Sequence, residues 1–564
     1  MMKKIKIFIA SVGLCLLGFA GYNFTEDYFE VSKNLDVFAT LFRELNIYYV
    51  DETKPGQLMK NGIDAMLSSL DPYTVYYPES DIEEYKFMTT GQYGGIGASV
   101  REIENKMVIV ELYEGAPAQK SGIEAGDIIL AVNGIKIDKK NSDDISKFLK
   151  GQPGSPVKLT VQHFNSSTPT DYTITREEIK LKDVPYSGML DNQVGYIKLT
   201  GFTQDAAKEV KDAFNKLKTE GNCKSIILDL RGNPGGLLQQ AVDIVNLFTE
   251  KGEIVATTKG KLKEWDNTLK GVNNPIDLQM PIVVLVDRNS ASASEVVSGS
   301  LQDLDRAVVV GERTYGKGLV QQTRNLVYNS ALKLTVAKYY IPSGRCIQAL
   351  DYSQKDIDGV VLKVPDSLVT AFKTKGGRIV YDGAGVMPDV KINSESMSHL
   401  AFTLISKNHV FNYANEYVSK NKNKKFDPRT FSLSDVEYDD FVNMVKKGDH
   451  KYETDSEKEL ERFKKIAEED KQFKDVEKEY NALITRLKDS KKDDFIKFKT
   501  EVKELLETEI ISRIHFDAGR LEAGIKYDKE LTSAIELAKD SMRIKTILTT
   551  IEKPTKPFNP NKKF

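Results

Sequence analysis

The fold is decided by residues 281–310, which read PIVVLVDRNSASASEVVSGSLQDLDRAVVV. An apolar run of five residues, 282–286, is typical of a strand buried on both faces. Residues 293–304 then predict a helix, and residues 307–310 predict a second apolar strand. A strand, a turn, a helix and a strand in this order form the unit of an α/β sheet with largely parallel pairing.

The same unit recurs on the N-terminal side of this stretch. Residues 194–199 and 225–230 predict strands, and residues 205–217 and 237–248 predict helices. The sequence therefore predicts an α/β core that extends over about residues 181–395.

Before this core, short strands alternate with glycine turns. The sequences GGIG at 94–97, GAPA at 115–118 and GDIILAVNG at 126–134 occur in the order found in PDZ domains. Residues 91–178 therefore resemble a PDZ domain that is inserted before the core. Glycine lets consecutive backbone N–H groups point into one concavity, which suits a terminal carboxylate. The candidate peptide-binding residues are Gly94, Gly95, Ile96 and Gly97.

Helical patterns flank the two domains. Apolar residues at helical spacing predict an N-terminal helical module over residues 25–90 and a C-terminal helical region over residues 396–552. The spacing Ser456-x-x-Glu459 is typical of a capping box. The apolar stripes of the C-terminal region favour helical hairpins that pack on each other, and a coiled coil that binds a partner is the alternative. Residues 553–564 predict a disordered tail.

The first residues indicate export. Lys3, Lys4 and Lys6 precede an apolar run over residues 7–20, as in a secretory signal. Residues 1–22 are therefore predicted to be a signal peptide or a signal anchor, with membrane anchoring by this segment as the second reading. We expect the body of the protein in the periplasm or on the outer face of the cytoplasmic membrane.

Composition sets further bounds. A chain of 564 residues is too long for one core. A net charge of −2 gives no reason to expect nucleic acid as a partner. The three cysteines form neither a metal-ligand cluster nor a disulfide framework. Cys15 lies in the N-terminal apolar run, and Cys223 and Cys346, which could pair only if the fold brought them together, are predicted to be small buried thiols. The five histidines are scattered and lack the His-Glu-x-x-His spacing, so we expect no metal and no cofactor.

The predicted core contains no histidine, so a nucleophile there needs another base. Ser292 lies at a predicted turn from strand to helix, near the positive end of a helix dipole. A serine at this place can also be a plain N-cap. Lys317 lies between Gly316 and Gly318, which would hold it in a tight site, and Gln321 follows four residues later.

These segments resemble the C-terminal processing (tail-specific) peptidases. The resemblance rests on SASASE at 290–295, GKGLVQ at 316–321, DLRGNPGG at 229–236 and GAGVMPD at 383–389, and it covers about residues 30–395. It implies a crotonase-like α/β protease core and serine-type endopeptidase activity. Ser292 and Lys317 would form a catalytic dyad, with Gln321 orienting the lysine. The implied partners are protein or peptide substrates, bound by their C-terminal region through the PDZ domain.

The dyad is chemically reasonable. A free lysine has a pKa of about 10.4, and burial brings it towards the range in which the amine accepts a proton from serine. The backbone N–H of Ala293 is a candidate oxyanion donor, with a second from Gly235 or Gly236. Glu295 and Asp303 are supporting candidates that can equally be structural.

Two other functions remain open at this stage. One is a catalytically silent PDZ scaffold or chaperone of the envelope, which would have no use for a lysine in a desolvated pocket. The other is an acyl hydrolase that uses the same dyad on substrates other than peptides.

Overall fold

The computed structural model describes residues 28–137, 142–355, 361–363, 368–393, 396–422, 424–551 and 553. The predicted signal, 1–22, lies outside these residues, as does the predicted tail except for Lys553. None of the described helices combines the length and the apolar character needed to cross a membrane. The chain forms two compact units, of which the first comprises residues up to Tyr76 together with Leu332–Leu334.

The first unit is helical. Residues 28–48 form one helix and α2 (Pro55–Ser68) forms the next, in agreement with the helical pattern of this segment. The Asp71 carboxylate accepts hydrogen bonds from the backbone of Tyr73 and Thr74, both at 2.8 Å, and so forms the turn after α2. The unit ends at Tyr76, which falls inside the helical module predicted for residues 25–90. The segment that follows contains η1 (Glu79–Asp81) and α3 (Ile82–Thr90).

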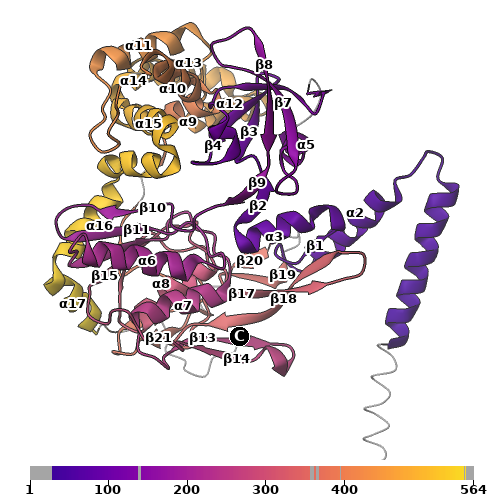
Figure 1. Ribbon diagram of the computed structural model, residues 1–564, viewed down its shortest axis with the longest axis vertical. Coiled ribbons are helices and arrows are strands. Elements are labelled where there is room, and N and C mark those ends of the chain that lie inside the picture. The colour runs from indigo at the N-terminus through magenta and orange to yellow at the C-terminus, as the bar shows by residue number, and fades with distance from the viewer. Residues whose placement is uncertain are drawn as a thin grey trace, which may run out of the picture. The chain divides into compact units, whose positions relative to one another are not determined.

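The second unit contains the predicted α/β core (Figure 1). Its central sheet has the order β10-β11-β12-β15-β16-β23, in which every pair except β10 with β11 is parallel. The strands are β10 (Tyr186–Met189), β11 (Val194–Lys198), β12 (Ser225–Asp229), β15 (Ile282–Val286), β16 (Val308–Gly311) and β23 (Val390–Lys391). This arrangement confirms the α/β class predicted from the apolar runs.

Helices cover both faces of this sheet. On one face, α6 (Ala206–Thr219), α7 (Leu238–Phe248) and α8 (Ala293–Asp303) bury the largest apolar cluster, which includes Phe202, Phe214 and Phe248. On the other face lie α16 (Lys529–Lys539) and α17 (Ser541–Thr549), which bury Leu531, Leu537 and Ile544 against the strands. Figure 1 shows these two helices in yellow beside the core. The core thus includes residues far beyond its predicted end at 395.

A second, antiparallel layer adjoins α7 and α8. It pairs β14 (Asn267–Lys270) with β13 (Ile254–Gly260), β13 with β18 (Ala331–Tyr340), and β18 with β17 (Leu319–Asn325). Short hairpins complete the region: β19 (Leu350–Lys355) with β20 (Val361–Lys363), and β21 (Ala371–Lys373) with β22 (Ile379–Tyr381). The 3-10 helix η2 (Lys263–Trp265) lies between β13 and β14.

The PDZ-like segment forms its own sheet and apolar core. The sheet order is β3-β4-β5-β7-β8, with β6 added to β5. The elements are β3 (Ala98–Ile103), β4 (Lys106–Leu112), α4 (Pro117–Lys120), β5 (Ile128–Val132), β6 (Ile135–Lys136), α5 (Ser142–Leu149), β7 (Pro156–Gln162) and β8 (Pro169–Thr175). A separate pair, β2 (Gln92–Gly95) with β9 (Glu177–Lys180), joins the two ends of the domain.

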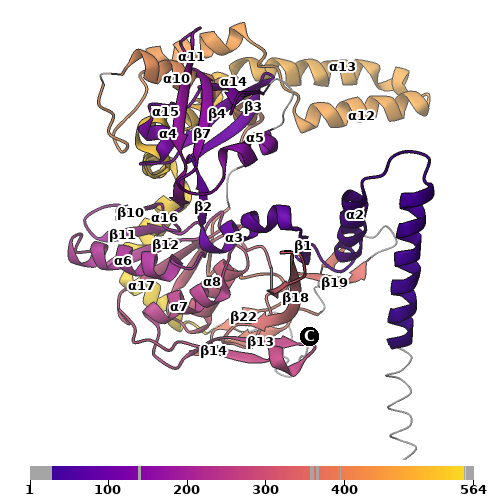
Figure 2. The ribbon, with the colours of Figure 1, turned by 45° about the vertical axis from the view of Figure 1, so that its right-hand side comes forward.

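The C-terminal region is helical, as predicted. The helices α9, α10, α11, α14 and α15 enclose a core of their own, with Phe441, Val502 and Ile510 fully buried. Their bounds are α9 (His399–Ser406), α10 (His409–Lys420), α11 (Asp435–Lys447), α12 (Asp455–Glu469), α13 (Phe473–Ser490), η4 (Lys491–Asp493), α14 (Asp494–Lys497), α15 (Lys499–Gly524) and η5 (Ile525–Tyr527). Figure 2 shows α12 and α13 side by side as a hairpin, which is the kind of arrangement predicted for this region.

Two smaller predictions can be compared with the structure. The capping box of α12 consists of Thr454 and Glu457 and not of Ser456 and Glu459, because the helix begins at Asp455. Thr454 lies at the N-cap, where its N–H donates to the Glu457 carboxylate (2.8 Å). Cys223 and Cys346 are free and buried, as expected of small apolar thiols. Cys15 lies outside the described residues.

Candidate active site

Ser292 lies where β15 passes into α8, at the N-cap of the helix. Its backbone has φ 56° and ψ −113°, a conformation that non-glycine residues adopt rarely and at a cost of about 1–3 kcal/mol. The cost is offset because the Ser292 carbonyl accepts hydrogen bonds from the N–H groups of Glu295 (2.8 Å) and Val296 (3.0 Å). Ser292 also forms a capping box with Glu295, so it is the N-cap of α8, and its strained backbone is a feature that an ordinary N-cap lacks.

The Glu295 carboxylate connects the serine turn to the lysine loop. Its Oε2 accepts the backbone N–H groups of Ser292 and Lys317, both at 2.8 Å. Its Oε1 accepts the Thr314 hydroxyl (2.6 Å) and the Gly316 N–H (2.7 Å). Burial raises the pKa of Glu295 to about 7, although these four hydrogen bonds favour the ionised form. The backbone N–H groups of Ser292 and Lys317, which are 25 positions apart in the sequence, therefore bind the same Glu295 oxygen, Oε2.

The glycine turn after β12 lies against the serine turn. A Cβ on Gly235 would come within 2.7–2.9 Å of Ala291, Ser292 and Ala293, and the φ of Gly235 is +100°. Only glycine fits there. The turn is fastened by Asn233, whose carbonyl accepts the Ala291 N–H (3.0 Å) and whose side chain accepts the Gly235 N–H (2.9 Å).

The N–H groups of this turn differ in what they can offer. The Gly235 N–H is already bonded to Asn233, so it is a poor oxyanion donor. Among the residues that the structure describes, no acceptor bonds the N–H of Gly236 or of Ala293. The close neighbour of Gly236 is Phe202, with which it forms an isolated bridge. Of the two glycines named by the sequence, Gly236 thus has the available N–H.

Gln321 lies on β17, next to the strand β18. Its Nε2 donates to the Thr335 hydroxyl at 3.2 Å, which orients the side-chain amide. Its role towards Lys317 stays a prediction from the family resemblance. Lys317 precedes β17 and is half-buried.

Asp303 lies at the opposite end of α8 from Ser292. Eleven residues of helix separate the two by about 16 Å. Asp303 faces the fully buried Arg345 at 2.9 Å and accepts the backbone N–H of Ser343 at 3.0 Å. The structure does not bring Asp303 to the candidate site, and its contacts are those of a structural ion pair.

The DLRG motif at 229–232 joins the core to α16. Arg231 bonds Asp229 (2.6 Å), Asp528 (2.6 Å) and Glu530 (2.9 Å), the last two from the start of that helix. Burial would raise the pKa of Asp229, but Lys198 and Arg231 outweigh it and hold the pKa below its ordinary value. The motif therefore positions the last helices of the chain against the sheet.

The PDZ loop supplies free backbone donors. Within the described part of the chain, no acceptor bonds the N–H groups of Ile96 and Gly97. The Ile96 side chain is 1% exposed in the domain core, so only its backbone can meet a peptide. The next strand, β3, pairs with β4 alone among the described strands, and α5 packs beside it. This is the geometry needed to add a peptide strand next to a carboxylate nest.

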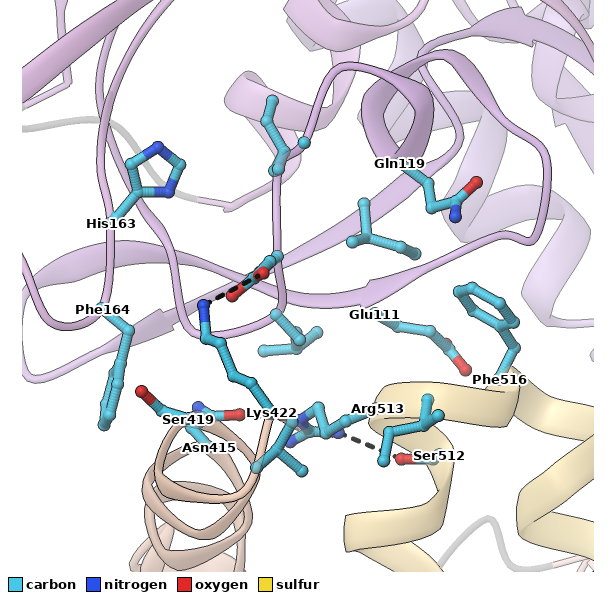
Figure 3. A pocket seen from close by; sticks show the side chains of 18 of the residues that line it. Glu111, Gln119, His163, Phe164, Asn415, Ser419, Lys422, Ser512, Arg513 and Phe516 are labelled. Atoms are coloured by element: carbon cyan, nitrogen blue, oxygen red, sulfur yellow. Dashed lines mark hydrogen bonds and ion pairs between the residues drawn. The ribbon is translucent and has the colours of Figure 1, made fainter. Parts of the chain in front are cut away.

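A cavity of about 600 Å³ lies between the PDZ domain and the helices α10 and α15 (Figure 3). Figure 3 shows Glu111 and Gln119 on one side, and Asn415 and Arg513 on the other. Near it, Phe516 interrupts α15 with φ 55° and packs against the PDZ core. Neither Ser292 nor Lys317 lines this cavity. The cavity therefore belongs to the interface between the PDZ domain and the C-terminal helices and not to the candidate active site.

Sequence reasoning missed three residues of the site: Asn233, Thr314 and Tyr339. Asn233 and Thr314 lie inside motifs that the sequence analysis quoted or adjoined, so their proximity could have suggested a role. Tyr339 lies on a strand remote in sequence from Ser292, and its hydroxyl bonds the Ser292 carbonyl at 3.1 Å. No sequence signal distinguishes it from an ordinary core tyrosine.

Comparison with known proteins agrees with this architecture. A model of peptidase family S41 matches residues 193–358, and a PDZ domain model matches residues 108–163. A model described as "Probable PDZ-protease, C-terminal helical domain" matches residues 400–538.

Three similar proteins illustrate the relationship. The carboxy-terminal-processing protease of Bartonella bacilliformis is 36% identical over 359 residues, which are 62% of this chain and 81% of that protein. A "Probable CtpA-like serine protease" of Staphylococcus aureus is 37% identical over 320 residues, 56% of this chain and 62% of that protein. The solved structure of a photosystem II D1 C-terminal processing protease is 25% identical, covers 63% of this chain and 92% of its own, and has a TM-score of 0.33.

Fold and comparisons together define a serine-type peptidase that carries a PDZ domain and a C-terminal helical domain. The chain belongs to the carboxy-terminal-processing proteases of peptidase family S41.

Proposed function

We propose that this peptidase is an exported endopeptidase that captures the C-terminal region of its substrates through the PDZ domain and cleaves with Ser292 and Lys317. The observation that carries the proposal is the shared Glu295 oxygen, which holds the backbones of both residues at 2.8 Å. A strained serine turn beside a glycine turn with an available N–H supports the same reading.

In the proposed reaction the neutral Lys317 amine takes the proton from the Ser292 hydroxyl as its oxygen attacks the substrate carbonyl carbon. The N–H groups of Ala293 and Gly236 would stabilise the resulting oxyanion. The C–N bond then breaks, and the lysine ammonium gives its proton to the leaving amine. Water, deprotonated by the same lysine, releases the acyl group and restores Ser292. Gln321 would orient the amine.

The test combines labelling by a fluorophosphonate probe with a peptide-cleavage assay. We expect labelling of the protein at Ser292 and cleavage of an internal bond in the peptide. Labelling without peptide cleavage would indicate an acyl hydrolase with another substrate. The absence of both would indicate a silent scaffold and would contradict the proposal.

Carboxylate capture by the PDZ loop is tested with two forms of one substrate protein. Amidation of the tail removes the charge that the Ile96 and Gly97 N–H groups would bind, and charged hydrogen bonds contribute about 1.5–3 kcal/mol each. We expect kcat/KM to fall about ten-fold or more for the amidated form. A short unstructured peptide that reaches the active site unaided should be cut equally in both forms.

A protein variant should reproduce the effect of amidation. A Cβ at Gly94 would lie 2.1 Å from the Gly151 carbonyl oxygen, and one at Gly97 would lie 2.2 Å from Ala116, so substitution there would disturb the fold. At Gly95 a Cβ would lie 2.7 Å from the Tyr93 ring, a side chain that can shift, and 3.7 Å from the Leu149 carbonyl oxygen, so Gly95→Val is the informative change. Equal cleavage of free and amidated tails by the intact protein would indicate binding of internal segments instead.

Export is proposed from the N-terminal sequence. Three lysines followed by an apolar run are the features that a secretion machinery reads. An epitope tag placed after Lys553 should become accessible to externally added protease in cells with a permeabilised outer layer. Protection of the tag in such cells, with a periplasmic control protein digested, would place the body inside the cytoplasm.

A further inference from the structure

Tyr339, on β18, contacts both halves of the candidate dyad. Its hydroxyl donates a hydrogen bond to the Ser292 carbonyl at 3.1 Å and bonds the Lys317 carbonyl as well. Its backbone N–H donates to the Gly318 carbonyl at 3.0 Å. The residue is 2% exposed, so it does not reach a substrate. A single phenolic hydrogen is therefore shared between two backbone carbonyls that belong to different segments of the chain.

Glu295 binds the same two residues on their other side. Its Oε2 accepts the N–H groups of Ser292 and Lys317, each at 2.8 Å. Ser292 and Lys317 thus share one acceptor for their N–H groups and one donor for their carbonyls. In both Ser292 and Lys317, therefore, Glu295 binds the backbone N–H and Tyr339 binds the backbone carbonyl.

We propose that Tyr339 is a positioning residue for the reaction: with Glu295 it sets the separation between the serine nucleophile and the lysine base. The inference rests on the proposed Ser292–Lys317 dyad. The helix already holds Ser292 through the N–H groups of Glu295 and Val296. The lysine loop has no such regular structure, since Lys317 lies before β17 begins. Hydrogen bonds from the Ala349 N–H to the Gly316 carbonyl (2.9 Å) and from the Gly318 N–H to the Gln348 side chain (2.7 Å) hold the loop on either side of the lysine. Glu295 and Tyr339 are the side chains that join Lys317 to Ser292, and a misplacement of about 1 Å costs roughly 100-fold in rate.

The simpler reading is that Tyr339 only fills the core. Its ring packs in the largest apolar cluster, and a buried tyrosine hydroxyl usually finds a partner. Tyr339→Phe separates the two readings because it keeps the ring and the backbone bond to Gly318 but removes the hydroxyl. A core role affects stability and has no special relation to Lys317. A positioning role affects the chemical step and disappears when the base is absent.

The experiment compares wild type, Tyr339→Phe, Lys317→Ala and the double variant in the full-length protein. kcat and KM are measured on one peptide, and labelling of Ser292 is followed with a fluorophosphonate probe. For Tyr339→Phe we expect kcat to fall about 10- to 100-fold while KM changes less than about two-fold. In the Lys317→Ala background, removal of the Tyr339 hydroxyl should leave the residual labelling rate unchanged.

Tyr340→Phe is the matched control. Tyr340 follows Tyr339 on the same strand, so its side chain points to the opposite face. It is also buried, and its ring lies beneath the Lys259 ammonium. It should keep the wild-type kcat. The end point of probe labelling counts folded sites, so kcat per labelled site stays meaningful where a variant folds incompletely.

Several outcomes would overturn the inference. These are a wild-type kcat per labelled site in Tyr339→Phe, a rise in KM alone, or an equal slowing of labelling with and without Lys317. If the residual labelling of Lys317→Ala is too slow to detect, the test rests on whether Tyr339→Phe lowers kcat or raises KM. Full activity of Lys317→Ala would remove the base itself and overturn the dyad along with its positioning. If Lys317→Ala lost activity and Tyr339→Phe kept it, the dyad would stand and only the positioning role of Tyr339 would be overturned.

Discussion

Lys317→Ala and Ser292→Ala should each lower kcat by about 10⁴- to 10⁶-fold, and the double variant should be no worse than either. The nucleophile and the base act as one unit, so the second loss removes nothing that still works. Both variants should keep their circular dichroism spectrum, because neither side chain belongs to the buried core. Ser292→Ala removes the capping box of α8 and should lower the free energy of unfolding by about 1 kcal/mol, whereas Lys317→Ala should keep the unfolding midpoint. Peptide cleavage measured per milligram of folded protein checks the result.

Lys317→Arg should be as inactive as the alanine variant, since a guanidinium stays protonated at every working pH. Lys251→Ala is the matched control, because Lys251 is an exposed lysine in the turn after α7. It should keep wild-type activity. Substantial cleavage by Lys317→Ala would rule out lysine as the base.

The second large effect concerns Glu295 and pH. Its pKa is about 7 in the folded protein against 4.5 for an ordinary glutamate, because burial disfavours the charged form. The stability that this group contributes is complete below pH 4.5 and is lost as the pH rises through 7. The shift corresponds to about 3 kcal/mol. Burial also raises the pKa of Glu504 to about 7, and this group titrates in both proteins. We therefore expect the free energy of unfolding to fall by about 3 kcal/mol more in the wild type than in Glu295→Gln between about pH 4.5 and 8.

The same variant should lose activity for a separate reason. Four donors point at the two carboxylate oxygens, and a glutamine amide nitrogen cannot accept any of them. We expect kcat to fall about 100-fold. Urea unfolding at several pH values provides the measurement, with exposed Glu250→Gln as the control that keeps the wild-type slope. Parallel stability curves for wild type and Glu295→Gln would contradict the assignment.

Features that depend on local pattern could be predicted from the sequence. Residues 282–286 are a continuous apolar run, residues 226–228 are an apolar run between Ser225 and Asp229, and the PDZ domain has glycine turns between its strands, so short-range rules suffice. Ser292 and Lys317 could be named for the same reason, since each lies in a distinctive short motif. Their predicted chemistry still awaits the variants above.

Features that depend on tertiary contacts could not be predicted. The helices α16 and α17 look like any other part of a Lys- and Glu-rich region, and only their buried face reveals that they cover the core sheet. Asp303 and Glu295 lie on the same helix and are both fully buried. Asp303 faces Arg345 and Glu295 faces the lysine loop. Helical spacing alone does not predict which of these partners each carboxylate has.

The position of α16 and α17 has a consequence for how the enzyme comes into being. The sheet that carries Ser292 has all its strands up to β16 by residue 311, yet one of its faces stays uncovered until residues 529–549 have been synthesised. The ion pairs of Arg231 with Asp528 and Glu530 likewise cannot form before these residues have been synthesised. A growing chain can therefore fold its PDZ domain early, but it cannot complete its proteolytic core until residues 529–549 have been synthesised. Chains that stop short of α16 should stay inactive, which spares the cell an unfinished protease.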